Sequence, residues 1–138
     1  MVTMKVRWSI YVLVCCVLLC LTGCGSNKEA QRSVLRVGVV LYTQDDPFIN
    51  ALTDCLKEDL EDYETDSLKI IMTVRDGKND QKLQDEVVEE ILDAGCDILV
   101  VDLVDRTEPS NIIKMAKNEN IPVIFFNREP VREDLMQW

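Results

Sequence analysis

Three side chains that could bind a polar ligand lie close together after the first apolar run of the sequence. Residues 37–41 carry no polar side chain, and Tyr42, Asp46 and Phe48 follow within seven positions. Aromatic rings stack on the C–H faces of sugars, and a carboxylate accepts charge-assisted hydrogen bonds from hydroxyl groups. The combination predicts a site for a polyhydroxylated ligand. The simpler alternative for Asp46 is a helix N-cap, with Pro47 at the first helical position.

A second carboxylate, Asp102, lies in the apolar run ILVVDLVD. Burying an unpaired charge is costly, so either the strand has ended and Asp102 faces water, or Asp102 meets a polar ligand. Asp105 is expected to be a turn residue, and residues 76–80 predict a turn followed by a helix cap. An exported α/β enzyme that uses Asp46 and Asp102 for acid–base chemistry is the alternative function.

These residues need a fold that brings them together, and the apolar pattern predicts one. Apolar runs of strand length at residues 34–42, 68–74, 97–104 and 122–126 alternate with three helical patterns. The order β-α-β-α-β-α-β predicts an α/β fold with a parallel sheet covered by helices on both faces. Ligands of such sheets bind beyond the carboxyl ends of the strands, where we expect the site to lie.

The helical patterns predict which side chains face the core. In the first helix these are the apolar residues at steps of three and four, namely Phe48, Leu52, Cys55, Leu56, Leu60 and Tyr63. In the second they are Leu83, Val87, Val88, Ile91 and Leu92, with Gly95 ending the helix. The third helix, in residues 109–120, has a weaker pattern. Cys55 and Cys96 are expected to be buried free thiols, with a disulfide between them as the alternative.

The N-terminus has the pattern of an export signal. A basic start without acidic residues precedes an apolar run at residues 8–21, which is shorter than the roughly 20 residues that a spanning helix needs. The LTGC that follows resembles the lipobox of bacterial lipoproteins. The resemblance implies a signal peptide at residues 1–23, lipidation of Cys24 and a polar tether at residues 24–33. An ordinary signal peptide that contains a cysteine is the alternative.

Composition excludes several classes of function. The chain contains no histidine, which excludes Ser-His-Asp and Cys-His catalysis and histidine-based metal sites. Its formal net charge is −10, and the predicted signal contains basic residues but no acidic ones, so the mature part is more acidic still. A nucleic-acid partner is therefore not expected.

Four stretches carry a resemblance to a known family. The chain resembles the N-terminal part of bacterial periplasmic sugar-binding proteins of the ribose/galactose type, above all the D-galactose/methyl-galactoside-binding subunit of an ABC importer. The matching stretches, which together span nearly all of residues 36–130, are RVGVVLYTQDDPF, DGKNDQ, DILVVDLVD and IPVIFFNREP. The family fold, a periplasmic-binding-protein fold of type I, has two α/β lobes joined by a hinge that close on one monosaccharide.

The resemblance also implies roles for individual residues. Phe48 falls on the stacking aromatic of the family, Asp46 on its hydroxyl acceptor in the first lobe, and Tyr42 on a further tyrosine of the cleft. Asp102 stands where the family has an asparagine. An aspartate accepts hydrogen bonds from sugar hydroxyls but cannot donate, so the identity of the sugar stays open.

The same resemblance implies the partners of the protein and the part of the family fold that this chain covers. It implies a non-enzymatic protein, lipid-anchored on the extracytoplasmic face of the cell membrane, that delivers a galactose-like or glucose-like monosaccharide to permease and ATPase subunits. Residues 34–138 would be a partial N-terminal lobe. The second lobe, the hinge and the calcium loop of the family fall outside this chain, so we expect a fragment without a cofactor that does not bind sugar measurably by itself.

Overall fold

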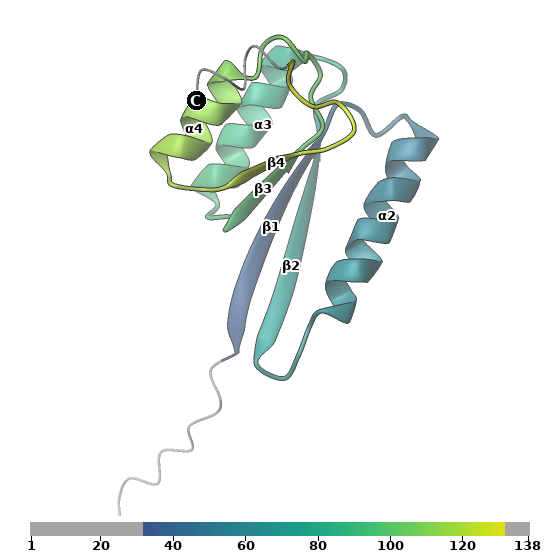
Figure 1. The fold of residues 1–138 in the computed structure, drawn as a ribbon, viewed down its shortest axis with the longest axis vertical. Coiled ribbons are helices and arrows are strands. Elements are labelled where there is room, and N and C mark those ends of the chain that lie inside the picture. The colour runs from purple at the N-terminus through teal and green to yellow at the C-terminus, as the bar shows by residue number, and fades with distance from the viewer. Residues whose placement is uncertain (1–31, 132–138) are drawn as a thin grey trace, which may run out of the picture. The chain divides into compact units, whose positions relative to one another are not determined.

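The computed structural model describes residues 32–131, which form a parallel sheet and three helices (Figure 1). The strands are β1 (Ser33–Leu41), β2 (Leu68–Asp76), β3 (Ile98–Val101) and β4 (Val123–Phe125). The helices are α2 (Pro47–Asp62), α3 (Gln81–Asp93) and α4 (Ser110–Asn118). The strand order is β2-β1-β3-β4, and each neighbouring pair is parallel. The predicted α/β class and the order of elements are confirmed.

Two apolar clusters lie on opposite faces of the sheet, one beneath α2 and the other beneath α3 and α4 (Figure 1). The central strand β1 contributes to both, because successive side chains of a strand point to opposite faces. Val37, Val39 and Leu41 belong to the cluster beneath α2, and Val40 belongs to the cluster beneath α3 and α4. All four are almost completely buried, which explains the continuous apolar run of β1.

Helix α3 packs against the sheet through the side chains that its pattern predicts. Val87, Val88, Ile91 and Leu92 are all buried. The helix approaches β1 so closely that a Cβ on Gly38 would lie 2.4 Å from Cγ2 of Ile91. Gly95, with φ of +81°, follows the end of α3 in the left-handed conformation that glycine adopts readily. The second helix and its glycine stop are therefore confirmed.

Helix α2 buries a different face from the one predicted. Its buried residues are Ile49 and Thr53, and the predicted core residues Phe48 and Tyr63 are 63% and 72% exposed. Only Leu56 and Leu60 of the predicted set pack against the cluster beneath α2, together with Ile49. The sequence contains two apolar stripes on this helix, and the stripe that includes Ile49 faces the sheet.

The cysteine prediction is partly wrong. Cys96 is buried beneath α3, as expected, but Cys55 is exposed on the outer side of α2. This error follows from the choice of helix face, because Cys55 belongs to the stripe that does not face the sheet. Both cysteines are free, so the disulfide alternative is not supported.

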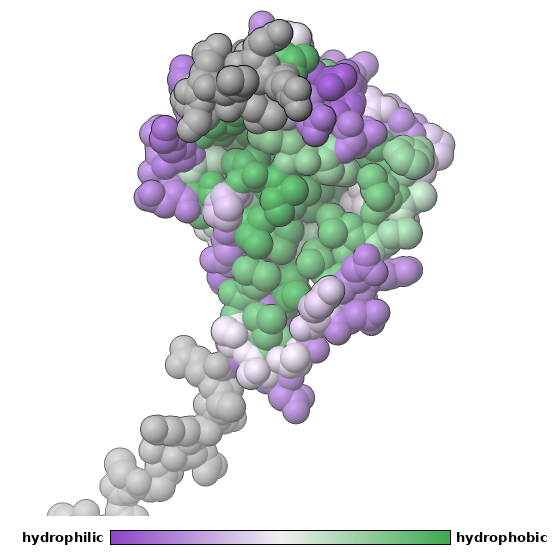
Figure 2. Space-filling model, in the orientation of Figure 1, coloured by the Kyte–Doolittle hydropathy of each residue, from purple (hydrophilic) through white to green (hydrophobic). Residues whose placement is uncertain are grey.

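The outer strands β2 and β4 are not covered on both faces in the described part of the chain. Ile71 of β2 is 43% exposed and Ile124 of β4 is 52% exposed. Figure 2 shows hydrophobic surface over the strands, between α2 and the other helices. The prediction of strands covered on both faces holds for β1 and fails at these edges. A sheet of this width needs more helical cover than the described helices supply.

The N-terminal predictions fall outside the described residues. They are the signal peptide at residues 1–23, the lipidated Cys24 and all but the end of the tether at residues 24–33. The compact unit that contains the sheet begins at Arg32, close to the predicted domain start at residue 34. Within residues 32–131, no helix is long and apolar enough to cross a membrane.

Candidate ligand-binding site

Asp46 lies between the end of β1 and the start of α2, and both of its carboxylate oxygens are hydrogen-bonded. Oδ1 accepts from the backbone N–H of Phe48 at 2.8 Å, which makes Asp46 the N-cap of α2. Oδ2 accepts from the Tyr42 hydroxyl at 2.5 Å. The N-cap role foreseen as the simpler alternative is therefore present, and the bond to Tyr42 adds a contact that a cap does not require.

The bond between Tyr42 and Asp46 shifts the pKa values of both groups. Donation from Tyr42, followed by donation from the Phe48 amide, lowers the pKa of the Asp46 carboxyl. The same bond is the largest cause of the raised pKa of Tyr42. At neutral pH the pair is a neutral phenol that donates to an ionised carboxylate. Each carboxylate oxygen has two acceptor sites, so Asp46 keeps acceptor capacity for a ligand hydroxyl.

Asp102 follows directly after β3 and is fully buried. Its carboxylate accepts hydrogen bonds from Nδ2 of Asn127 at 3.1 and 3.3 Å and from the backbone N–H of Arg128 at 3.1 Å. Burial raises the pKa of the Asp102 carboxyl, and these donors oppose the rise. Of the two alternatives that the sequence left open for Asp102, exposure to water is wrong.

Arg128 joins the two carboxylate groups of the site. Its guanidinium lies 4.6 Å from the centre of the Tyr42 ring, in a cation–π contact, and donates from Nη2 to the carbonyl oxygen of Val104 at 2.7 Å. Its backbone N–H is bound by Asp102. The side chains that follow β1, β3 and β4 thus meet at one edge of the sheet, as the parallel topology predicts.

The predicted site omitted Asn127 and Arg128. Both come shortly after β4, beyond the carboxyl end of a strand where ligands were expected, and the strand-end rule therefore pointed to them, but they were not assigned to the site. Asn127 has a φ of +53°, in the left-handed region that asparagine tolerates better than most residues. The pairing of Arg128 with the Tyr42 ring depends on side-chain conformation, which sequence spacing does not determine.

Phe48 lies at the first turn of α2 next to this cluster and exposes most of its ring. An exposed phenylalanine beside a carboxylate with free acceptor sites offers one apolar and one polar contact to a ligand. The adjacent surface forms an open hollow, which is lined by Tyr42, Thr43, Asp45, Asp46, Pro47, Asp76, Lys78 and Asn79. Tyr42 and Asp46 line this hollow, whereas Phe48 does not line it and is linked to Asp46 through its backbone N–H; Asp102 is buried and bound to Arg128.

The other predicted turn residues have structural roles. Asp80 caps α3 by accepting from the backbone N–H groups of Lys82 and Leu83. Asp105 accepts from the backbone and hydroxyl groups of Thr107, which lowers the pKa of Asp105. Both roles are as predicted. Among residues 32–131, no cluster of acidic residues and cysteines is arranged to hold a metal ion.

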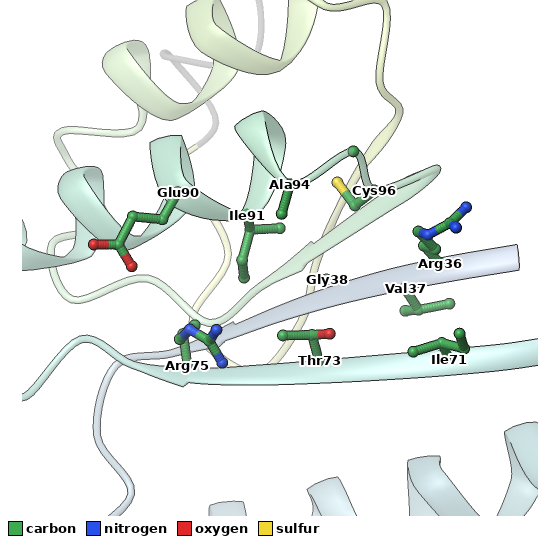
Figure 3. A pocket seen from close by; sticks show the side chains of 11 residues that line it. Arg36, Val37, Gly38, Ile71, Thr73, Arg75, Glu90, Ile91, Ala94 and Cys96 are labelled. Carbon is green, nitrogen blue, oxygen red and sulfur yellow. The ribbon is translucent and has the colours of Figure 1, made fainter.

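A separate cavity of about 180 Å³ lies between α3 and strands β1 and β2 (Figure 3). Gly38, Thr73 and Ile91 line its floor and wall, and Arg36 and Arg75 lie at its margin. None of the predicted site residues contributes to it. It occupies the part of the sheet that α3 does not fully cover, beside the exposed strand β2.

The enzyme alternative requires two carboxylates that can both reach a substrate. The environments of Asp46 and Asp102 shift their pKa values in opposite directions, as an acid–base pair would need. However, Asp102 has no exposed surface and directs its oxygens at Asn127 and Arg128. The arrangement can bind and orient a ligand, but it does not present two accessible carboxylates.

Comparison with proteins of known sequence identifies related binding proteins. The chain is 36% identical over 106 residues to the D-galactose/methyl-galactoside binding periplasmic protein MglB of Haemophilus influenzae, covering 77% of this chain and 31% of that protein. It is 27% identical over 100 residues to the ribose import binding protein RbsB of Escherichia coli, covering 72% and 32%. The chain thus spans about a third of the length of these relatives. Both names describe binding proteins rather than enzymes.

Solved structures agree with this relationship. A solute binding protein of an ABC transporter from Burkholderia multivorans matches with a TM-score of 0.65 and 17% identity, over 76% of this chain and 37% of that chain. A second, from Bacillus halodurans with bound myo-inositol, matches with a TM-score of 0.59 and 26% identity, over 78% and 35%. The periplasmic binding protein domain matches residues 37–136. This range includes the candidate site and all four strands, apart from the first residues of β1. The chain belongs to the periplasmic binding protein domain family.

Proposed function

We propose that this chain supplies one wall of the ligand site of a solute-binding protein, which captures a monosaccharide of the galactose or glucose type for an ABC importer. The observation that carries the proposal is the cluster of Tyr42, Asp46 and Phe48 at the carboxyl end of β1, with Arg128 stacked on the Tyr42 ring. The names of the relatives, which refer to galactosides and ribose, support a sugar as the ligand.

The four side chains have complementary roles in this proposal. Phe48 stacks on the C–H face of the sugar, and Asp46 accepts hydrogen bonds from hydroxyl groups. The Tyr42 hydroxyl donates a hydrogen bond to Asp46, so the Tyr42 oxygen can still accept one from the ligand. Arg128 uses one nitrogen on Val104 and has other N–H groups that can donate to sugar oxygens.

Asp102 takes an indirect role in the proposed site. The sequence placed it in direct contact with the sugar, but its carboxylate is buried and bound to Asn127 and Arg128. We propose that Asp102 fixes these two residues at the site. The carboxylate thereby holds the backbone from which the Arg128 side chain reaches the Tyr42 ring.

A panel of monosaccharides tests the binding function in the natural full-length protein. Thermal melting is recorded with and without millimolar D-galactose, D-glucose, D-ribose and myo-inositol, and a ligand that binds the folded state raises the melting temperature. We expect at least one hexose to raise it, and we expect Asp46→Ala to abolish the rise. If no sugar changes the melting temperature, the proposal is wrong. If Asp46→Ala lowers stability but keeps the sugar-dependent rise, Asp46 is only a helix cap.

We also propose that the protein is anchored by lipid at Cys24 on the extracytoplasmic side of the membrane, with permease and ATPase subunits as partners. This part rests on the LTGC sequence, which lies outside the described residues. Two acyl chains anchor a protein stably where one does not. Cells supplied with labelled palmitate should label the natural protein and fail to label Cys24→Ala, which should also leave the membrane fraction. Labelling of the variant would contradict the anchor.

A further inference from the structure

The side chain of Gln84 is a buried polar group in the interior of α3. Gln84 is fully buried, together with the apolar residues of α3 that face the sheet. Burying an amide costs free energy unless its donor and its acceptor both find partners. The positions of those partners therefore show what the amide holds in place.

Both partners of Gln84 belong to the loop that follows β3. Nε2 donates to the carbonyl oxygen of Asp102 at 2.8 Å, and Oε1 accepts from the backbone N–H of Val104 at 2.9 Å. A single side-chain amide thus satisfies one acceptor and one donor of the backbone, as a neighbouring strand would. The loop is fixed to α3 at two points separated by one residue.

The three residues of this loop each bind Arg128. The Asp102 carboxylate accepts from the Arg128 backbone N–H, and the Leu103 backbone N–H donates to the Arg128 carbonyl oxygen at 3.3 Å. The Val104 carbonyl oxygen accepts from the Arg128 guanidinium. The loop that Gln84 fixes is therefore the support for both the backbone and the side chain of Arg128.

Gln84 also packs against the turn after β2. A Cβ on Gly77 would lie 3.4 Å from Nε2 of Gln84 and 2.7 Å from the carbonyl oxygen of Leu41. The Gly77 backbone N–H donates to that same Leu41 oxygen at 2.8 Å, at the end of the strand that leads to Tyr42. Gln84 thus lies behind the ends of β1, β2 and β3 at once.

We propose that Gln84 is a positioning residue for the ligand site: its amide holds the loop of Asp102 and Val104 so that Arg128 lies over the Tyr42 ring. This inference rests on the proposed function, because it assumes that Arg128 contacts the sugar. Gln84 itself does not touch the ligand. Its effect on affinity passes through the backbone of the loop to Arg128.

A variant of Gln84 and a matched variant of Val88 test this role. Gln84→Met has a similar size and loses both hydrogen bonds. Val88→Ala is the control, because Val88 is equally buried on α3 and lies in the apolar cluster without a polar side chain. It should destabilise the protein without altering the loop.

The first measurement is the affinity for D-galactose in the natural full-length protein, by calorimetry at a temperature where every variant is folded. We expect Gln84→Met to weaken binding about tenfold, the size of effect that a lost pair of buried hydrogen bonds can produce, and Val88→Ala to leave it within about twofold. Equal affinity of Gln84→Met and Val88→Ala overturns the proposal.

The second measurement does not need a ligand. Amide hydrogen exchange at Val104 and Arg128 should become faster in Gln84→Met than in Val88→Ala, because only the first variant frees the loop. If the natural protein binds none of the sugars tested, the proposed function fails and this exchange alone decides the positioning role. Unchanged exchange at Arg128 in Gln84→Met would then refute it.

Discussion

Replacement of Asp102 gives the sharpest test of the buried network behind the site. Asp102→Ala removes an acceptor that serves the backbone N–H of Arg128 and the side-chain amide of Asn127, in a position without exposed surface. A buried donor left without a partner costs about 1–3 kcal/mol, and the removed carboxylate also leaves a small cavity. We expect a loss of about 2–4 kcal/mol in the free energy of unfolding.

Asp102→Asn is the matched variant. Its side-chain oxygen can still accept from Arg128, and the amide of Asn127 can rotate to present its oxygen to the new NH₂ group. We expect a loss below about 1 kcal/mol near pH 7. Urea denaturation of the natural full-length protein, followed by circular dichroism, measures both variants. If Asp102→Ala costs no more than Asp102→Asn, the hydrogen bonds to Asn127 and Arg128 do not stabilise the fold.

The pH dependence of the free energy of unfolding, compared between the natural protein and Asp102→Asn, gives a second readout. Burial raises the folded-state pKa of the Asp102 carboxyl above its unfolded value, so its stabilising contribution is complete below the unfolded pKa and is lost as the pH rises through the folded pKa. Asp102→Asn stays neutral throughout. Its stability relative to the natural protein should therefore increase over the pH range between the unfolded-state pKa and the raised folded-state pKa of Asp102. A relative stability that falls over this range would refute the assigned direction.

Two further predictions concern single contacts. Tyr42→Phe removes the hydroxyl that lowers the pKa of the Asp46 carboxyl, so an NMR titration should find this pKa higher in the variant; an unchanged value would mean that the bond is absent in solution. Gly38→Ala should lower the free energy of unfolding by about 2–3 kcal/mol, because its Cβ would meet Ile91 at 2.4 Å, and urea denaturation measures the loss. Gly95→Ala, with no atom within 4 Å of its Cβ but a φ of +81°, should cost only about 1 kcal/mol; equal losses would contradict the close packing of α3.

The sequence predicts the fold of this chain well because strands and helices alternate with distinct apolar patterns. The runs that became β1 and β3 are buried on at least one face along most of their length, and the cap of α2 and the glycine stop of α3 lie where local chemistry places them. The predicted strand at residues 97–104 was too long, since β3 ends at Val101. Apolar residues beyond that point pack in a loop, and periodicity alone cannot separate such a loop from a strand.

The sequence predicts part of the cluster of side chains at the candidate site, and ligand binding by these residues stays a prediction. Tyr42, Asp46 and Phe48 lie together because they share the end of one strand and the start of one helix, which local sequence determines. Asp102 was assigned a direct ligand contact, whereas its contacts with Asn127 and Arg128 depend on how two distant loops fold together. Spacing along the chain carries no information about such contacts. The face of α2 was misjudged for a similar reason, because two apolar stripes compete and only packing decides between them.

The most direct test of the central claim is the affinity of the natural full-length protein for D-galactose when Phe48 is replaced by alanine. Tyr63→Ala is the control, because Tyr63 is a similarly exposed aromatic residue at the opposite end of α2. If Phe48 stacks on the sugar, calorimetry should find binding weakened about tenfold by Phe48→Ala and unchanged by Tyr63→Ala. Equal affinities of the two variants would contradict the assignment of the ligand site to the end of β1.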